Sequence, residues 1–298
     1  PKIRCLAIMS SVLLVYVCFL CLIFWIEWYK FQSKKRDGDF IKESWEQYNV
    51  RVHSRVSKYN GPNPFERRET SFYEAMKRLL MTPIALVRVA LFVILVMLGA
   101  IVSYPASKWR FQRKATSKLL RFCCRIILFI FGFYDIAVTN LNQKGVNINK
   151  AARIIVANHH TVFDGIFLLY FTDAVIAATA ELQYIPFFGN CMIALNTLFI
   201  DRHGKDGRNR AKQQIIDHVN NDNLPPLMIF PQGTTTSIAT ISTFKPGAFL
   251  SGKPVLPVVF DWSHNTNWDV SYVGETGMLK EVFYAGCQFI NYCHITIL

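Results

Sequence analysis

An imidazole and a carboxylate lie five residues apart in the segment NHHTVFDG, at His159 and Asp164. An aspartate that holds one ring nitrogen of a histidine leaves the other nitrogen able to remove a proton from a hydroxyl group. On one continuous helix the two side chains would point about 140° apart and would not meet. They can meet if His159 lies in a loop that leaves a strand and Asp164 lies in the first turn of the next helix. The segment therefore predicts a general base at a strand-to-helix junction.

From residue 134 onward, short β-branched runs alternate with helical patterns. Strands are predicted at Ile136–Leu141, Arg153–Ala157, Val175–Ala178, Thr197–Asp201, Leu227–Phe230, Val255–Phe260, Val270–Val273 and Phe289–Ile297. Helices are predicted at Asp164–Tyr170, Ile185–Ala194, Asp206–Asn220 and Gly247–Ser251. This alternation predicts an α/β fold, a mixed β-sheet flanked by helices, with the active site at loops beyond the strand ends.

Two apolar stretches precede this region. Residues 5–26 contain no charged residue, and a helix of that length extends about 33 Å, which is enough to cross a bilayer. A cleavable signal peptide is the alternative, but the run is long and no small-residue cleavage site follows it. The second stretch, Val89–Ser107, lies between Pro83 and Pro105. It either crosses the bilayer or enters it and returns as a hairpin.

Basic residues surround both stretches. The segment from Lys108 to Phe133 interleaves lysine and arginine with apolar residues, which is typical of a helix lying on anionic lipid headgroups. A basic solvated face on a core helix is the alternative. Residues 30–78 carry 12 lysines and arginines, against two before the first stretch. The positive-inside bias places residues 30–78 on the cytosolic or matrix-like side and favours a hairpin over a second crossing.

The formal net charge of +13 is spread along these juxtamembrane segments. Lipid phosphate therefore explains the charge better than nucleic acid does, and an acidic cosubstrate is compatible with it. The eight cysteines show no zinc-binding spacing and indicate no disulfide framework. We divide the chain into a transmembrane helix at 1–30, a polar linker at 31–82, a hairpin with a basic interfacial helix at 83–133, and an α/β domain at 134–298.

Three further segments carry residues suited to substrate binding. Arg202 follows a predicted strand and offers a rigid fork for a phosphate, although an ion pair with Asp201 is the alternative. FPQGTTT at 230–236 places a tight turn after a strand, where amides and hydroxyls can surround an oxyanion or a headgroup. FKPGAF at 244–249, followed by KPVLPVV at 253–259, indicates by itself only a cap and a buried strand.

Together and in this order, these blocks resemble the glycerophospholipid acyltransferase superfamily, and in particular its lysophosphatidylcholine acyltransferase branch. That superfamily has an H-x4-D block, a strand ending in Arg, a Glu-Gly-Thr block and a Pro-rich apolar strand. The corresponding segments here are His159 to Asp164, the strand ending at Arg202, Gln232-Gly233-Thr234, and Val255 to Val258. The segment TFKPGAF, which contains Lys245, is especially similar to the lysophosphatidylcholine branch. The resemblance extends over about residues 83–273.

The resemblance implies that His159, oriented by Asp164, deprotonates the free hydroxyl of a lysophospholipid. The oxygen would then attack the thioester of acyl-CoA directly, without an acyl-enzyme. His160 is the competing base, but an H-x3-D spacing does not match the superfamily. The substrate-binding residues implied are Arg202, Gln232, Gly233, Thr234 and Lys245. No metal and no tightly bound cofactor are expected, and acyl-CoA is the cosubstrate.

Two positions depart from the superfamily pattern. Gln232 replaces its Glu, which keeps hydrogen bonding but loses the carboxylate. Thr235 stands where phosphatidate-forming relatives have Arg, which favours a lysophospholipid with an esterified headgroup as the acceptor. The alternative function is a catalytically impaired acyltransferase-fold subunit of a membrane protein assembly. A sister acyltransferase that uses another acceptor, such as glycerol 3-phosphate, is a third hypothesis.

We expect an integral membrane protein that contacts membrane phospholipids, a lysophospholipid and acyl-CoA, but no nucleic acid. The endoplasmic reticulum is the expected location, and a mitochondrial membrane is the alternative. If the chain is a subunit of an assembly, it also has membrane-complex partners.

Overall fold

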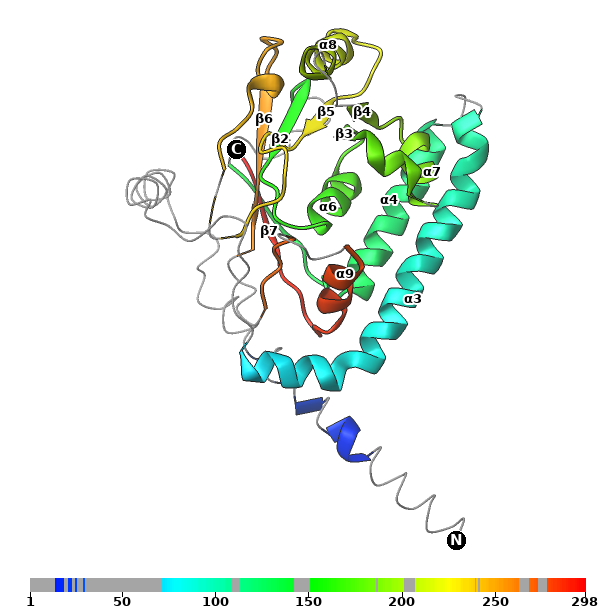
Figure 1. Ribbon diagram of the computed structural model, residues 1–298, viewed down its shortest axis with the longest axis vertical. Helices are drawn as coiled ribbons and strands as arrows, with labels where there is room; N and C mark the ends of the chain where they lie inside the picture. Colours follow the sequence, from blue (N-terminus) through cyan, green and yellow to red (C-terminus); the bar gives the residue numbers. More distant parts are fainter. Residues whose placement is uncertain are drawn as a thin grey trace.

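A seven-stranded sheet forms the centre of the fold (Figure 1). The computed structural model describes residues 14–18, 21–22, 25, 29, 71–108, 113–141, 151–185, 187–200, 207–238, 240, 242–262, 268–272 and 278–298. The strands in chain order are β1 (Ala137–Asn140), β2 (Ile154–Ala157), β3 (Val175–Thr179), β4 (Leu198–Ile200), β5 (Leu227–Ile229), β6 (Val255–Asp261) and β7 (His294–Ile297). Their order across the sheet is β1-β7-β6-β2-β5-β3-β4.

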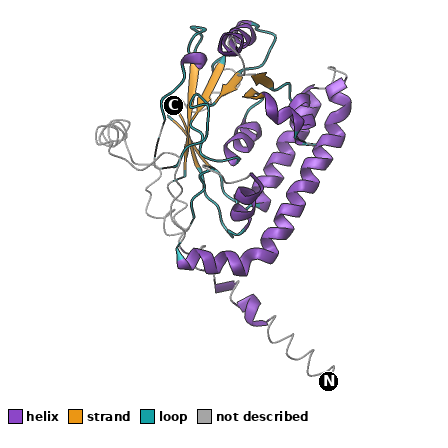
Figure 2. Ribbon diagram, viewed as in Figure 1, coloured by secondary structure: helices purple, strands orange, loops and turns teal. Residues whose placement is uncertain are grey.

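Neighbouring strands are parallel except for the antiparallel pair β6 and β7. Parallel neighbours require crossover connections, which the helices between them supply. The predicted mixed sheet flanked by helices is therefore confirmed (Figure 2). The longer helices are α3 (Phe72–Lys108), α4 (Arg113–Ile130), α6 (Phe163–Phe171), α7 (Phe188–Ala194), α8 (Gly207–Asn220) and α9 (Met278–Gly286).

The central strand β2 is buried on both faces, as its uninterrupted apolar run IIVA requires. Ile155 and Ala157 belong to the larger core, which includes side chains of α4, α6 and α9. Ile154 and Val156 belong to a smaller core that includes α8. Because side chains alternate along a strand, these two cores cover opposite faces of the sheet.

Six of the predicted strands coincide with β1 to β6 to within a residue or two at each end. The strand expected at Val270–Val273 is wrong for residues 270–272, which form a loop. There the Ser271 N–H donates to Asp269 Oδ1 at 2.9 Å, and the Tyr272 N–H donates to the His160 carbonyl at 2.7 Å. These bonds use the backbone groups that a ladder would need.

The strand expected at Phe289–Ile297 begins only at His294. The side-chain amide of Asn291 donates to the carbonyls of Phe131 and Ala285, which holds the preceding segment against the helices. The helix α9 was not expected from the sequence. Two of the predicted helices are shorter than expected. The helix expected at Ile185–Ala194 is α7, which begins only at Phe188. In place of the helix expected at Gly247–Ser251 there is a single 3₁₀ turn, η3 (Pro246–Ala248).

The boundary expected between residues 82 and 83 lies inside α3. Pro83 removes one backbone N–H from the helix, which usually bends or ends it. Here the Thr82 hydroxyl donates to the Arg78 carbonyl at 2.8 Å, and the Tyr16 hydroxyl donates to the Leu80 carbonyl at 2.7 Å. These two carbonyls lie about one turn before the proline, on either side of the Leu79 carbonyl whose helical partner Pro83 removes. The helix continues past the proline, with the bend that is visible in Figure 1.

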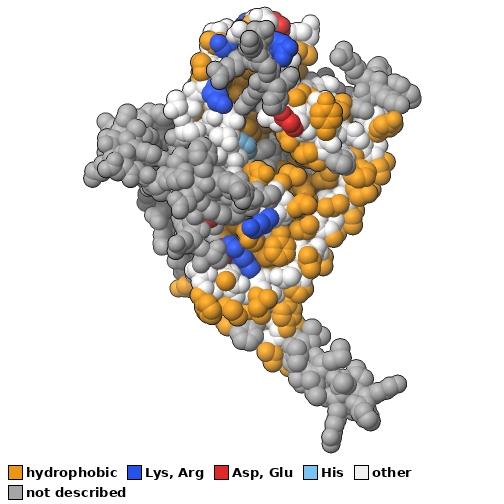
Figure 3. Space-filling model, viewed as in Figure 1, with side chains coloured by type: hydrophobic (Ala, Val, Ile, Leu, Met, Phe, Trp, Pro, Cys, Tyr) orange, Lys and Arg blue, Asp and Glu red, His pale blue; other side chains and the backbone are white. Residues whose placement is uncertain are grey.

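Within the described residues, Phe72–Tyr104 of α3 is the one segment long and apolar enough to cross a membrane, by length and composition. Only 17% of its most apolar 18-residue stretch is buried, so this part of the helix is not enclosed in the core. Figure 3 shows hydrophobic side chains, in orange, gathered over the right-hand side of the molecule, where Figure 1 places α3. Of the first predicted span, residues 14–18, 21, 22 and 25 are described, and they are helical.

Candidate active site

The loop between β2 and α6 carries His159, and the first turn of α6 carries Asp164. His159 Nδ1 lies 2.9 Å from Asp164 Oδ2. The two side chains meet because the chain turns between them, as a strand–loop–helix arrangement requires.

The Asp164 carboxylate is fully buried and accepts hydrogen bonds at both oxygens. Oδ2 accepts from the His160 N–H at 2.6 Å and from the Thr161 N–H at 2.9 Å, besides its contact with His159. Oδ1 accepts from the indole N–H of Trp262 at 3.0 Å. These donors replace the water that a buried carboxylate lacks and hold it in one orientation.

The His159 ring is fixed from a second direction by Phe230. The two rings stack with centroids 3.9 Å apart and planes 13° apart. An ionised carboxylate only accepts hydrogen bonds, so Asp164 selects the tautomer that carries its proton on Nδ1. Nε2, on the opposite edge of the ring, then keeps its lone pair. The His159 side chain is 23% exposed, which allows a substrate hydroxyl to approach it.

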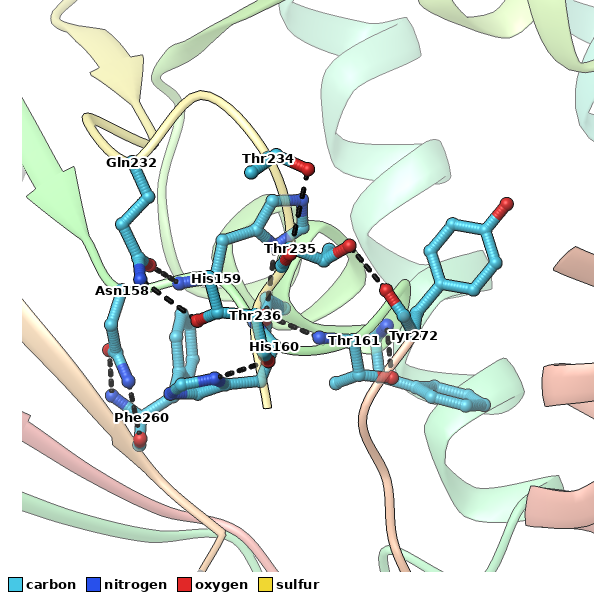
Figure 4. A network of polar contacts seen from close by, with 12 residues as sticks. Asn158, His159, His160, Thr161, Gln232, Thr234, Thr235, Thr236, Phe260 and Tyr272 are labelled. Atoms are coloured by element: carbon cyan, nitrogen blue, oxygen red, sulfur yellow. Dashed lines mark hydrogen bonds and ion pairs between the residues drawn. The ribbon is translucent and has the colours of Figure 1, made fainter. Parts of the chain in front are cut away.

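The ring of His160, the competing base, contacts the Thr236 backbone (Figure 4). Its side chain is buried, and its Nδ1 lies 2.9 Å from the Thr236 carbonyl oxygen. Asp164 contacts the backbone N–H of His160 and not its ring. The imidazole that Asp164 orients is therefore that of His159.

Gln232 is buried, and both ends of its amide bond to other parts of the chain (Figure 4). Oε1 accepts the backbone N–H of His159 at 2.6 Å, and Nε2 donates to Thr236 Oγ1 at 3.0 Å. The Thr236 N–H donates in turn to the His159 carbonyl at 3.0 Å. The turn after β5 thus holds the backbone of His159 on both sides.

Lys245, the residue before η3, extends its side chain to Gly233 in the turn after β5. Gly233 has a φ of +73°, and a Cβ at this position would lie 2.5 Å from Lys245 Nζ. The Lys245 N–H donates to the Pro231 carbonyl at 2.8 Å, which ties the two segments together. Thr234 is exposed beside them. Arg202, the remaining predicted binding residue, lies outside the described residues.

Three residues at this site were not expected from the sequence. Phe230 stacks on the imidazole, Trp262 bonds to the carboxylate, and Tyr272 donates its N–H to the His160 carbonyl. The first two directly follow β5 and β6. Active-site residues of such sheets lie just past the carboxyl ends of parallel strands, so the predicted strand ends could have indicated these two residues.

Cys293 is a buried cysteine whose thiol is affected by the charge of Asp164. Burial, followed by the negative charges of Asp164 and Asp261, raises the pKa of the Cys293 thiol well above its ordinary value. A neutral thiol is a poor nucleophile. Within the part of the chain that the structure describes, no group of three or more His, Cys, Asp or Glu residues is arranged to hold a metal ion.

Residues 137–261 match the family model described as Acyltransferase. This range begins with β1 and ends with the last residue of β6, so it contains His159, Asp164 and the turn after β5. Residues 137–261 are an acyltransferase-family domain. The resemblance that the motif blocks carry is thereby confirmed.

The chain is similar to lysophospholipid acyltransferase LPEAT2 of Arabidopsis thaliana, with 30% identity over 241 residues. It is also similar to lysophosphatidylcholine acyltransferase 1 of Mus musculus, with 31% identity over 208 residues. The matched regions make up 77% and 70% of this chain, but 43% and 38% of those two proteins. The chain therefore spans less than half the length of these relatives.

A solved structure shares the fold of the acyltransferase domain. It is the crystal structure of the 1-acyl-sn-glycerophosphate (LPA) acyltransferase PlsC from Thermotoga maritima, with a TM-score of 0.53 and 20% identity. The match covers 76% of this chain and 85% of that chain. The shared region is thus larger than the family-model match and includes elements outside it.

Replacing Asp164 with Asn places an amide NH₂ where the carboxylate accepts hydrogen bonds, so at least one N–H donor loses its acceptor. We expect the free energy of unfolding to fall by about 2–3 kcal/mol, measured by chemical unfolding in detergent. Asp173→Asn is the matched control, because the Asp173 carboxylate is exposed and pairs with Arg121 at 2.7 Å. Its loss should stay below about 1 kcal/mol. Equal losses in the two variants would contradict the network described for Asp164.

Proposed function

We propose that this chain transfers an acyl group from acyl-CoA to the free hydroxyl of a lysophospholipid, with His159 as the general base and Asp164 as the residue that orients it. The observation that carries the proposal is the 2.9 Å contact between His159 Nδ1 and a fully buried Asp164 carboxylate. The names of the similar plant and mouse proteins support the acyl acceptor.

In the proposed reaction, His159 Nε2 takes the proton of the acceptor hydroxyl as its oxygen attacks the thioester carbonyl of acyl-CoA. A new C–O bond forms, and the tetrahedral intermediate collapses by breaking the C–S bond. The CoA thiolate leaves and takes the proton back from the His159 imidazolium. Asp164 stabilises that imidazolium throughout. Cys293 is buried and its pKa is raised, so its thiol is not a candidate acyl carrier.

Lys245 is the proposed contact for a substrate phosphate. Its ammonium lies against the Gly233 turn, and that turn is bonded to the backbone of His159 through Gln232. A phosphate at this point would pair with the ammonium and with the exposed hydroxyl of Thr234. We retain Arg202 as a second phosphate contact on the basis of its place in the sequence. For Gln232 we propose a supporting role, because both ends of its amide already bond within the protein.

The exposed apolar surface of α3 supports catalysis at a membrane, where the lysophospholipid acceptor resides. We propose the endoplasmic reticulum as that membrane. The phospholipids of that membrane would then contact the exposed apolar side chains of α3.

The direct test of the proposal is His159→Ala in the purified chain, assayed with lysophosphatidylcholine and a panel of acyl-CoA donors. Losing the general base should lower kcat by about a thousandfold. His218→Gln is the control, because His218 lies on α8 and its Nε2 contacts the Pro225 carbonyl, far along the chain from the pair. Activity that survives His159→Ala at more than a tenth of the starting rate would rule out His159 as the base.

The alternative function, a subunit without turnover, is motivated by Gln232. A glutamate there can accept the His159 N–H, but it cannot donate to Thr236 Oγ1 as the amide does. We therefore expect Gln232→Glu to lower kcat/KM by about fivefold or more, because it loses one hydrogen bond and buries a carboxylate. No turnover by the unaltered chain, together with activity gained in Gln232→Glu, would favour the alternative.

A further inference from the structure

Trp262 directly follows β6 and is buried against the catalytic pair. Its indole N–H donates to Asp164 Oδ1 at 3.0 Å. The indole packs edge-on against Phe133, with ring centroids 5.9 Å apart, and against Phe167, with centroids 5.8 Å apart. These contacts hold the donor in one position relative to the carboxylate.

The two oxygens of Asp164 are bonded by different parts of the chain. Oδ2 receives the His159 ring and the backbone N–H groups of His160 and Thr161, all from the β2–α6 loop. Among the bonds between described residues, the Trp262 indole is the donor to Oδ1. The β2–α6 loop therefore holds one oxygen of the carboxylate, and Trp262 holds the other.

We propose that Trp262 is a positioning residue that acts through Asp164, fixing the carboxylate plane and limiting how strongly the carboxylate attracts the Nδ1 proton of His159. The proposal rests on the proposed function, in which His159 must be neutral to accept a proton. A donor to an ionised carboxylate disperses its negative charge and lowers its proton affinity. Without the indole N–H, Asp164 would hold the imidazolium more tightly, and His159 would stay protonated to a higher pH.

The other ionisable groups of the site come from four segments. His159 and His160 lie in the loop before it, and Asp261 precedes Trp262 at the end of β6. Cys293 lies just before β7, and burial keeps its thiol neutral. Lys245 lies just before η3, and its ammonium reaches Gly233 in the turn after β5.

Trp268 provides a matched control within the same core. It is 3% exposed, compared with 2% for Trp262, and its indole N–H donates to Asn291 Oδ1 at 2.9 Å. Replacement of either tryptophan with Phe removes the same atoms and one buried indole hydrogen bond, which goes to a carboxylate at position 262 and to a neutral amide at position 268. Only the replacement at position 262 removes a donor to Asp164.

The experiment compares Trp262→Phe with Trp268→Phe in the full chain, using chemical unfolding and the pH dependence of kcat and kcat/KM with lysophosphatidylcholine and acyl-CoA. We expect both variants to lose stability, with the larger loss in Trp262→Phe because its hydrogen bond is to a charged group. Trp262→Phe alone should lower kcat by about tenfold with little change in KM, because one positioning hydrogen bond to a charged group is lost. It alone should also move the acid limb of the pH profile to higher pH.

A second readout needs no turnover. The titration of the His159 ring, followed by NMR with labelled histidine, should move to higher pH in Trp262→Phe and stay unchanged in Trp268→Phe. Identical titrations in the two variants would overturn the role of Trp262. An inactive unaltered chain with the expected titration difference would overturn the proposed function and leave the role of Trp262 supported.

Discussion

The buried carboxylate of Asp164 is the constraint on which the rest of the site depends. An ionised carboxylate without water is very costly unless protein donors replace its hydration. Here the donors come from the loop after β2 and from the residue after β6. These hydrogen bonds fix the loop after β2 relative to the end of β6, because a donor that lost its acceptor would destabilise the fold.

The order of the strands explains how those donors converge. β2 lies between β6 and β5, with Ala157 opposite Val258 and Val156 opposite Ile229. Because the three strands are parallel, their carboxyl ends meet at one edge of the sheet, where ligands bind in folds of this kind. The His159 loop therefore lies between Trp262 on one side and Gln232 on the other. The first bonds to the carboxylate and the second to the backbone of the imidazole residue.

Much of this arrangement was predictable from local patterns. The alternation of apolar runs predicted the mixed sheet, and the spacing of His159 and Asp164 predicted a strand-to-helix junction. Both features depend on residues close together in the chain. The sequence also favoured His159 over His160, and the buried contact of the His160 ring with Thr236 agrees with that choice.

Features that depend on distant neighbours were not predictable in this way. A β-branched pattern suggested a strand at 270–272, but the Tyr272 N–H donates instead to the His160 carbonyl, more than a hundred residues away. From the sequence alone, Gln232 indicates the loss of the carboxylate that the superfamily has at this position. Its two bonds instead use an acceptor and a donor together, which a carboxylate cannot provide. Trp262 belongs to no sequence motif, because its contact with Asp164 depends on β6 lying next to β2 in the sheet.

The most direct test of the central claim is the tautomer of His159 in the unaltered chain, measured by ¹⁵N NMR with labelled histidine and assigned with a His159→Gln variant. Asp164 is expected to hold the ring proton on Nδ1, so the neutral ring should show a protonated Nδ1 and an unprotonated Nε2. A neutral ring protonated on Nε2 would contradict the account, because that nitrogen would then have no lone pair with which to accept the substrate proton.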